Sequence, residues 1–350
     1  MLLLLNLLTV TAALAAAPSV ILPTIAPCNP ESEIIKVLTA SDPGTPFCSK
    51  WNPDFSGNGQ KCCGVAPKRG KKRRMPLCKN RTSGNYCGDM TEDQKKYSME
   101  AQTGQLGDIL KLLTLEMGKK GEQAFCTVNN GFLANGRPVV STPANRIQIH
   151  SPDRCLNFGT DEMAAMLEWL GREVGEKYKG EKFKGVQLVV GDISGPRGGC
   201  LVGRSGRRGH ASHTSGQDAD IGFITAKEGE RSPALFHRRF DKTENWWFIK
   251  QIFKNPFACI KVIFLDQKHI DSLRNAFGKE SEWQSLKKFI IHMRGHSNHM
   301  HVRIGKGPGT PGCSPGAKPE EEFEDDFDAS DFYETSILDE LRSRQSSSVK

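Results

Sequence analysis

The chain has 350 residues, 37% of them hydrophobic, so it is long enough for two or three structural units with a buried core. Its net charge of +8 hides an asymmetry, because the segment from Lys318 to Lys350 carries −7 and leaves +15 for the rest. A basic body of this kind favours an anionic partner, such as a cell-wall polymer, a membrane surface or, least of the three if the protein is exported, a nucleic acid.

The first residues, MLLLLNLLTVTAALAAAPSV, have the apolar run and the small residues of a secretory signal peptide. Ala13-Leu14-Ala15 offers a cleavage site, so we expect residues 1–15 to be removed, although the usual positive start is missing. The alternative is a buried N-terminal helix. No other stretch is apolar enough to cross a bilayer. We therefore expect a mature protein without an integral membrane segment, exported to the periplasm or secreted, and with no nucleic-acid partner.

Eleven cysteines fit an exported protein, because disulfides form and persist in oxidising compartments. Six of them lie before residue 90 and mark residues 16–90 as a cysteine-rich region. The odd total leaves at least one thiol unpaired within the chain, and spacing alone does not give the connectivity. Zinc held by the N-terminal cysteines is the alternative, but the adjacent Cys62 and Cys63 do not match a repeated C-x-x-C pattern.

Two helices are predicted by apolar residues that recur at helical spacing. The first lies within residues 92–117, in a helical linker that we place at 91–125, and the second begins after Thr160, a favourable N-cap. Trp246 and Trp247 are expected to be buried in the core rather than to line a substrate groove.

Three stretches are predicted as strands: GVQLVVGDI (185–193), CIKVIFLD (259–266) and HMHVRI (299–304). The first two read as buried, whereas the third alternates as a half-exposed strand does. Helices and strands mix without a regular βαβ rhythm, so we expect an α+β fold with a small antiparallel sheet flanked by helices over residues 126–315. Residues 316–350, which are acidic and rich in serine, are predicted to form a disordered tail.

Five of the nine histidines are concentrated in RGHASHTSGQDADI (208–221) and GHSNHMHVR (295–303). On a strand, residues two apart face the same side, so His299, His301 and Arg303 share one face. The remaining histidines are predicted to be solvated: His150, His237, His269 and His292.

The stretch QDADIGFI (217–224) reads as the entry to another strand, with Asp218 and Asp220 on a common face. His213 precedes Asp220 by seven residues, across a turn that carries Gly216, so the loop can fold this imidazole back beside the carboxylate. Two histidines and one aspartate are the ligand number of a catalytic zinc, whose open position takes a water that the metal acidifies. The alternative is a hydrogen-bond network without metal.

The motifs VVGDISGPRGG, GHASHTSGQDADI and GHSNHMHVRI together resemble the penicillin-insensitive murein endopeptidases. These are zinc peptidases related to D-Ala-D-Ala carboxypeptidases and lysostaphin-like enzymes. The resemblance begins near residues 128–139, ends near Ile304 and covers about half of the chain. Thr214 and Gln217 stand where the family usually has Gln and Leu.

The resemblance implies Zn²⁺ as cofactor and three ligands for it: His213, Asp220 and His301. It implies that His299 acts as a base or stabilises the oxyanion, and that His296 is a further active-site histidine. His210 and Asp218 would orient a ligand or the loop, and Arg303 would support the same region.

The reaction that the resemblance implies is hydrolysis of the D-alanyl–meso-diaminopimelyl amide that cross-links peptidoglycan stem peptides. Use of a water instead of a serine acyl-enzyme would explain indifference to penicillin. Two alternatives remain open. One is a peptidoglycan carboxypeptidase or a peptidase of other specificity. The other is a non-catalytic, zinc-containing wall-binding module, like the hedgehog signalling domain.

Overall fold

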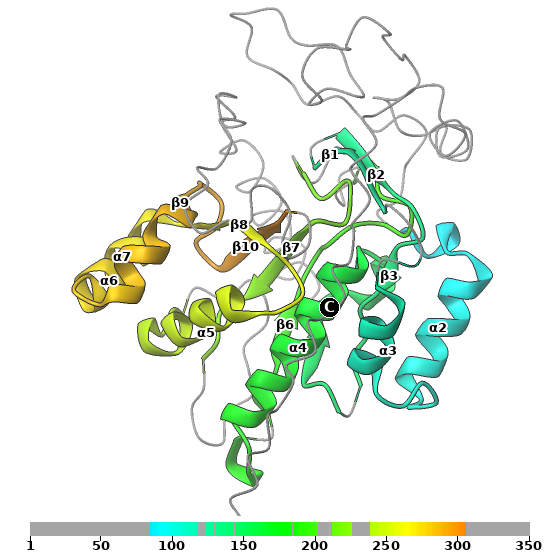
Figure 1. The fold of residues 1–350 in the computed structure, drawn as a ribbon, viewed down its shortest axis with the longest axis horizontal. Coiled ribbons are helices and arrows are strands. Elements are labelled where there is room, and N and C mark those ends of the chain that lie inside the picture. The colour runs from blue at the N-terminus through cyan, green and yellow to red at the C-terminus, as the bar shows by residue number, and fades with distance from the viewer. Residues whose placement is uncertain are drawn as a thin grey trace, which may run out of the picture.

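The computed structural model describes residues 85–305, apart from 118, 120–122, 129, 143, 184, 200, 202–209, 211 and 226–238. Its central element is a six-stranded sheet in the order β4-β6-β7-β10-β8-β9, and Figure 1 labels its strands β6 to β10. These strands are β4 (Ile147–Ile149), β6 (Leu188–Val190), β7 (Asp218–Gly222), β8 (Ile260–Leu265), β9 (Ile290–His292) and β10 (His299–Ile304).

The longer helices are α2 (Glu92–Gln102), α3 (Ile109–Glu116), α4 (Asp161–Lys177), α5 (Lys242–Lys254), α6 (Gln267–Phe277) and α7 (Ser281–Leu286). The part of the chain that the structure describes also has four short 3₁₀ helices: Cys87–Asp89, Pro152–Arg154, Glu181–Phe183 and Lys287–Phe289. Two small antiparallel pairs complete the fold: β1 (Ala124–Thr127) with β2 (Asn130–Leu133), and β3 (Arg137–Pro138) with β5 (Phe158–Gly159). Among the described residues, no helix has both the length and the apolar character that crossing a membrane requires.

The α+β class is confirmed, but the main sheet is mixed instead of wholly antiparallel. Its centre, from β6 through β7 and β10 to β8, is antiparallel, whereas the edge pairs β4–β6 and β8–β9 are parallel. Each parallel pair needs a crossover connection, which α4 supplies between β4 and β6, and α6 with α7 supplies between β8 and β9. The edge strands β4 and β9 have three residues each, too few to give a sequence pattern.

The predicted helices are present, although the first is interrupted. Between α2 and α3 the chain turns at Gly104 and Gly107, whose φ angles of 77° and 64° lie in the left-handed region that favours glycine. The helix after Thr160 is confirmed as α4, since the Thr160 side chain accepts the N–H of Met163 at 3.3 Å. Ile109 of α3 joins the same hydrophobic core as α4 and the main sheet.

The alternation of β10 places Met300 and Val302 in this core. All six residues of β10 are buried, so the expectation of a half-exposed strand is wrong. Its polar face lines the cluster of charged and histidine side chains described below. Trp246 is buried against the ring of Trp283, as expected, and Trp247 is partly buried at the edge of the core.

His269 corrects a second expectation, since it is buried rather than solvated. It lies on α6 and stacks on Phe240, with ring centroids 4.2 Å apart. Its Nε2 lies 2.9 Å from the carbonyl oxygen of Ser297. His292, on β9, is exposed as predicted. The aromatic neighbours that cover His269 are distant in sequence, which is why the local pattern did not reveal its burial.

A disulfide joins Cys87 to Cys155, and Cys259 is also disulfide-bonded, in agreement with the expected use of the cysteines. The predicted signal peptide (1–15), the acidic tail (316–350) and His237 lie outside the described residues, as does the cysteine-rich region before residue 85.

Candidate metal centre

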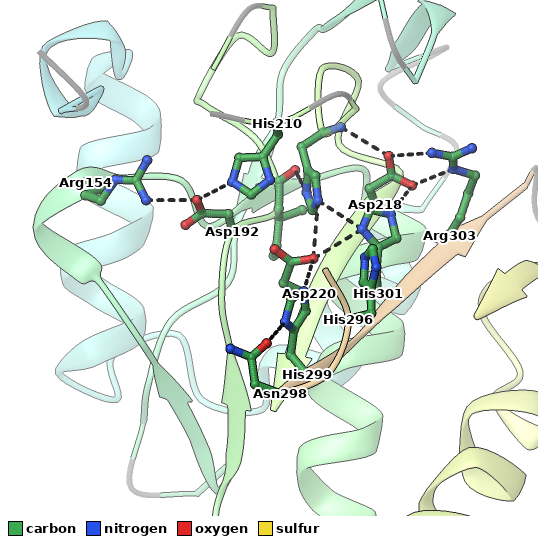
Figure 2. Close-up of polar contacts among 12 residues, drawn as sticks. Arg154, Asp192, His210, Asp218, Asp220, His296, Asn298, His299, His301 and Arg303 are labelled. Atoms are coloured by element: carbon green, nitrogen blue, oxygen red, sulfur yellow. Dashed lines mark hydrogen bonds and ion pairs between the residues drawn. The ribbon is translucent and has the colours of Figure 1, made fainter. Parts of the chain in front are cut away.

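The polar residues of β7 and β10 lie opposite one another at the middle of the main sheet. The antiparallel register pairs His301 with Asp220 and Arg303 with Asp218. Because residues two apart share a face, all four side chains project to one side of the sheet (Figure 2). We call the group of polar side chains here the cluster, and a single strand pair supplies most of it. Its members are His213, Asp218, Asp220, His296, His299, His301 and Arg303.

His213 reaches this cluster from the loop before β7. Its φ of 66° is left-handed, a conformation that costs a non-glycine residue about 1–3 kcal/mol and concentrates at functional sites. Its backbone N–H donates to Asp218 Oδ2 at 3.1 Å, and its ring Nδ1 lies 3.0 Å from the carbonyl oxygen of Ile193. A donating Nδ1–H leaves the lone pair on Nε2, the nitrogen that faces Asp220.

The turn between His213 and Asp218 depends on Gly216. This residue has a φ of 72°, and a Cβ placed on it would lie 2.9 Å from the Leu133 side chain and 3.1 Å from the Cα of Gly159. The turn therefore needs both the left-handed backbone and the absence of a side chain.

We expect Gly216→Ala to lower the free energy of unfolding by about 2–4 kcal/mol, from backbone strain and overpacking together. Gly104→Ala is the matched control, because Gly104 is also left-handed, with a φ of 77°, but has nothing within 4 Å of its Cβ position. The control should lose only the strain contribution of about 1–2 kcal/mol. Denaturant unfolding measures both variants, and equal losses would contradict the argued role of the close packing.

Three atoms that could bind a metal ion form an almost equilateral triangle at the centre of the cluster. His213 Nε2 lies 3.3 Å from Asp220 Oδ1 and 3.2 Å from His301 Nδ1, and the latter two atoms are 3.2 Å apart. Ligands about 2.0 Å from a tetrahedral zinc are separated from one another by about 3.3 Å. The triangle thus has the dimensions of one face of a tetrahedral metal site.

The burial and the negative charge of Asp220 also favour a cation at this position. Its Oδ1 is buried and accepts no hydrogen bond, although three imidazole nitrogens lie within 3.5 Å. Burial would raise the pKa of Asp220, but the imidazoles of His213 and His299 outweigh it and hold the pKa well below its usual range. A buried anion of this kind needs a positive partner.

Without metal, that positive partner is an imidazolium. Burial lowers the pKa of His213, but the carboxylates of Asp220 and Asp218 outweigh burial and raise this pKa to about 9. A metal ion that binds here displaces the proton, because only the neutral imidazole coordinates. The donor set of imidazole nitrogen and carboxylate oxygen suits zinc.

His210 is a further candidate ligand. Ligand atoms of His210, His213 and Asp220 all lie within 4.8 Å of one another, so this His/His/Asp group could hold a metal ion. The two overlapping sets share His213 and Asp220 and differ in whether His210 or His301 completes them. In the His301 set the atoms are 3.2–3.3 Å apart, and in the other set His210 Nε2 also lies 2.8 Å from Asp192 Oδ2.

Asp218 and Arg303 lie next to the triangle, on the side of His301. Arg303 Nε donates to Asp218 Oδ1 at 2.7 Å, and the same oxygen lies 3.1 Å from His301 Nε2. Burial would raise the pKa of Asp218, but Arg303 and His301 lower it well below its usual range. A carboxylate on one ring nitrogen fixes the imidazole so that the other nitrogen faces a metal.

We expect Asp218→Asn to weaken zinc binding by about 10–100-fold, because the amide no longer carries the charge that orients His301. Chelator competition measures the affinity. Asp108→Asn is the control, since it removes a carboxylate from an ion pair with Arg172 of 2.6 Å on the surface. Unchanged affinity in Asp218→Asn would refute the supporting role of this carboxylate.

The structure brings His299 and His296 to the same cluster. His299 Nδ1 lies 2.8 Å from Asn298 Oδ1, and its Nε2 lies 3.5 Å from Asp220 Oδ1. The His296 ring is 5.0 Å from that of His299 and 5.5 Å from that of His301, centroid to centroid. Burial, together with both neighbouring imidazoles, holds the pKa of His296 well below its usual range, so this ring is neutral.

Sequence reasoning missed Asp192, Arg154 and Asn298. Burial would raise the pKa of Asp192, but His210 and Arg154 outweigh it and keep the carboxyl ionised. A usable signal existed for Asp192, which lies two residues after β6, and for Asn298, which precedes His299 within the histidine-rich stretch. Arg154 gave none, because its partner is 38 residues away.

Comparison with protein families supplies an independent finding. The model of the penicillin-insensitive murein endopeptidases matches residues 124–346, which is more than half of the chain and includes every residue of the cluster. A search of curated proteins found no significant match.

Proposed function

The chain belongs to the penicillin-insensitive murein endopeptidase family, and we propose that it cuts the D-alanyl–meso-diaminopimelyl amide that cross-links peptidoglycan stem peptides. Membership of this metallopeptidase family makes it a hydrolase that acts on peptidoglycan. The choice of bond is our proposal. The observation that supports metal-dependent hydrolysis is the triangle of buried nitrogen and oxygen atoms, with edges of 3.2–3.3 Å, inside the region that the family model matches.

The cofactor that we propose is Zn²⁺, held by His213, Asp220 and His301. When bound, zinc acidifies a water molecule and polarises the scissile carbonyl. The protein itself orients the rings of the two histidine ligands. The Ile193 carbonyl oxygen lies 3.0 Å from Nδ1 of His213, and Asp218 Oδ1 lies 3.1 Å from Nε2 of His301, so the other nitrogen of each ring faces the centre.

His299 is proposed to move the proton. Asn298 engages its Nδ1, so Nε2 faces the centre and can accept a proton from the attacking water or return it to the leaving amine. His296 packs against His299 and His301 and is proposed as a further active-site histidine. As a neutral ring, it adds no charge that would repel the proton carried by His299.

The partner and the location follow from the same proposal. Peptidoglycan is an anionic polymer, and the +15 charge of residues 1–317 favours contact with it. Cleavage of the wall requires export, for which the predicted signal in residues 1–15 would serve. We therefore propose a periplasmic or secreted protein.

A digest of purified cross-linked sacculi tests the function. The protein is incubated with them, with and without a zinc chelator, and the released muropeptides are weighed by mass spectrometry. We expect chelator-sensitive conversion of cross-linked dimers to monomers. Loss of a terminal D-alanine with dimers intact would replace the proposal by a carboxypeptidase, and binding without any cleavage would replace it by a wall-binding module.

A further inference from the structure

A row of three polar side chains leads to the candidate centre and has no part in the proposed proton transfer. Arg154 Nη1 donates to Asp192 Oδ2 at 2.9 Å, and the same oxygen lies 2.8 Å from His210 Nε2. Figure 2 shows the three side chains in a row, in the order Arg154, Asp192 and His210, with His210 next to the cluster. The rings of His210 and His213 are 4.5 Å apart, centroid to centroid.

Asp192 also contacts the cluster through its backbone. Its carbonyl oxygen accepts the N–H of Asp220 at 3.0 Å, and the carbonyl oxygen of the next residue, Ile193, lies 3.0 Å from His213 Nδ1. These two consecutive residues therefore touch His210, His213 and Asp220. A shift of Asp192 would move all three groups that could hold a metal ion.

Arg154 is held from its other side by the N-terminal segment. Cys155 follows it directly and forms the disulfide with Cys87, across 68 residues of sequence. The N–H of Tyr86 donates to the carbonyl oxygen of Arg154 at 2.9 Å, and the Tyr86 side chain is buried. The disulfide and this hydrogen bond fix the backbone from which the guanidinium reaches Asp192.

We propose that Arg154 and Asp192 are positioning residues that hold His210 at the metal centre, and that the Cys87–Cys155 disulfide anchors them. This inference rests on the proposed function, because it concerns the same site. An intact disulfide would then support catalysis as well as stability. Without it the ligand residues remain, but Arg154 loses the anchor that keeps it on Asp192, and outer hydrogen-bond partners of this kind tune metal sites strongly.

The first test measures metal binding, which needs no substrate. We expect Arg154→Met and Asp192→Asn to weaken zinc binding by about 10–100-fold and to change the visible absorption spectrum of the cobalt-substituted protein. Arg172→Met is the matched control, because it removes another arginine–aspartate pair, of 2.6 Å, away from the cluster. Arg154→Met, partly exposed, keeps the test valid if Asp192→Asn fails to fold. An unchanged affinity and spectrum would overturn the proposal.

The second test asks whether the disulfide acts through Arg154. Cys87→Ser with Cys155→Ser should weaken zinc binding, as Arg154→Met does, and at saturating zinc should lower kcat on cross-linked muropeptides by about 10-fold with an unchanged KM. Added to Arg154→Met, the cysteine replacements should cause no further loss of kcat or zinc affinity, since coupled sites are not additive. Additive losses would refute the anchoring role. If the wild-type protein cleaves nothing, the proposed function fails, while zinc affinity and the cobalt spectrum still decide the positioning role.

Discussion

Asp220→Ala is expected to weaken zinc binding by more than about 100-fold, beyond the loss typical of outer hydrogen-bond partners. Asp220 Oδ1 is the vertex that His213 and His301 both face, at 3.3 and 3.2 Å, so its removal leaves two imidazoles and no anion for the metal. His301→Ala should have a similar effect, because it also removes one of the three protein ligands that we propose. Isothermal titration and metal analysis of the dialysed protein measure the loss.

Asp271→Ala and His292→Ala are the controls for these two variants, since both side chains lie outside the cluster and His292 is exposed. Each should keep the wild-type affinity and fold. If Asp220→Ala bound zinc as tightly as its control, the triangle would not be the metal site, and the hydrogen-bond network without metal would replace it.

His299→Ala is expected to keep zinc and to lose activity, with kcat lower by about 100–10,000-fold, the range typical of general acid–base residues. The reason is geometric. His299 is buried beside the triangle and is oriented by Asn298, yet its Nε2 is 3.5 Å from Asp220 Oδ1 and does not complete the triangle. Muropeptide cleavage and zinc content are measured on the same preparation.

His292→Ala again serves as the matched control, because it removes an imidazole from the neighbouring part of the sheet without touching the cluster. A thermal melt of each variant separates lost chemistry from lost stability, since His299 is buried and its truncation leaves a cavity. Full activity in folded His299→Ala would refute the proton-transfer role.

The faces of the two central strands could be predicted from sequence, because side-chain alternation has a period of two. That rule placed His299, His301 and Arg303 together and Asp218 with Asp220. The register that sets His301 opposite Asp220 could not be predicted, since it depends on how the strands β7 and β10 pair. The family resemblance nevertheless predicted that His301 and Asp220 lie close together, because it implies that both bind the same zinc ion.

Other contacts could not be predicted from local sequence patterns, because they join residues that are far apart in the chain. The burial of His269 arises from Phe240 and from a carbonyl 28 residues away, and neither contact leaves a periodic signal. The Arg154–Asp192 pair likewise joins the end of a 3₁₀ helix to the end of a strand. Polar contacts between distant loops depend on the tertiary fold, and a sequence pattern registers only neighbours.

The most direct test of the account measures zinc content and cross-link cleavage on the same samples of the full chain. Metal-free protein is loaded with increasing zinc, and the bound metal and the rate of dimer-to-monomer conversion are recorded together. We predict that the rate rises in proportion to the fraction of chains that carry zinc and that a chelator abolishes it. Cleavage by the metal-free protein, or no cleavage by the zinc-loaded protein, would contradict the account.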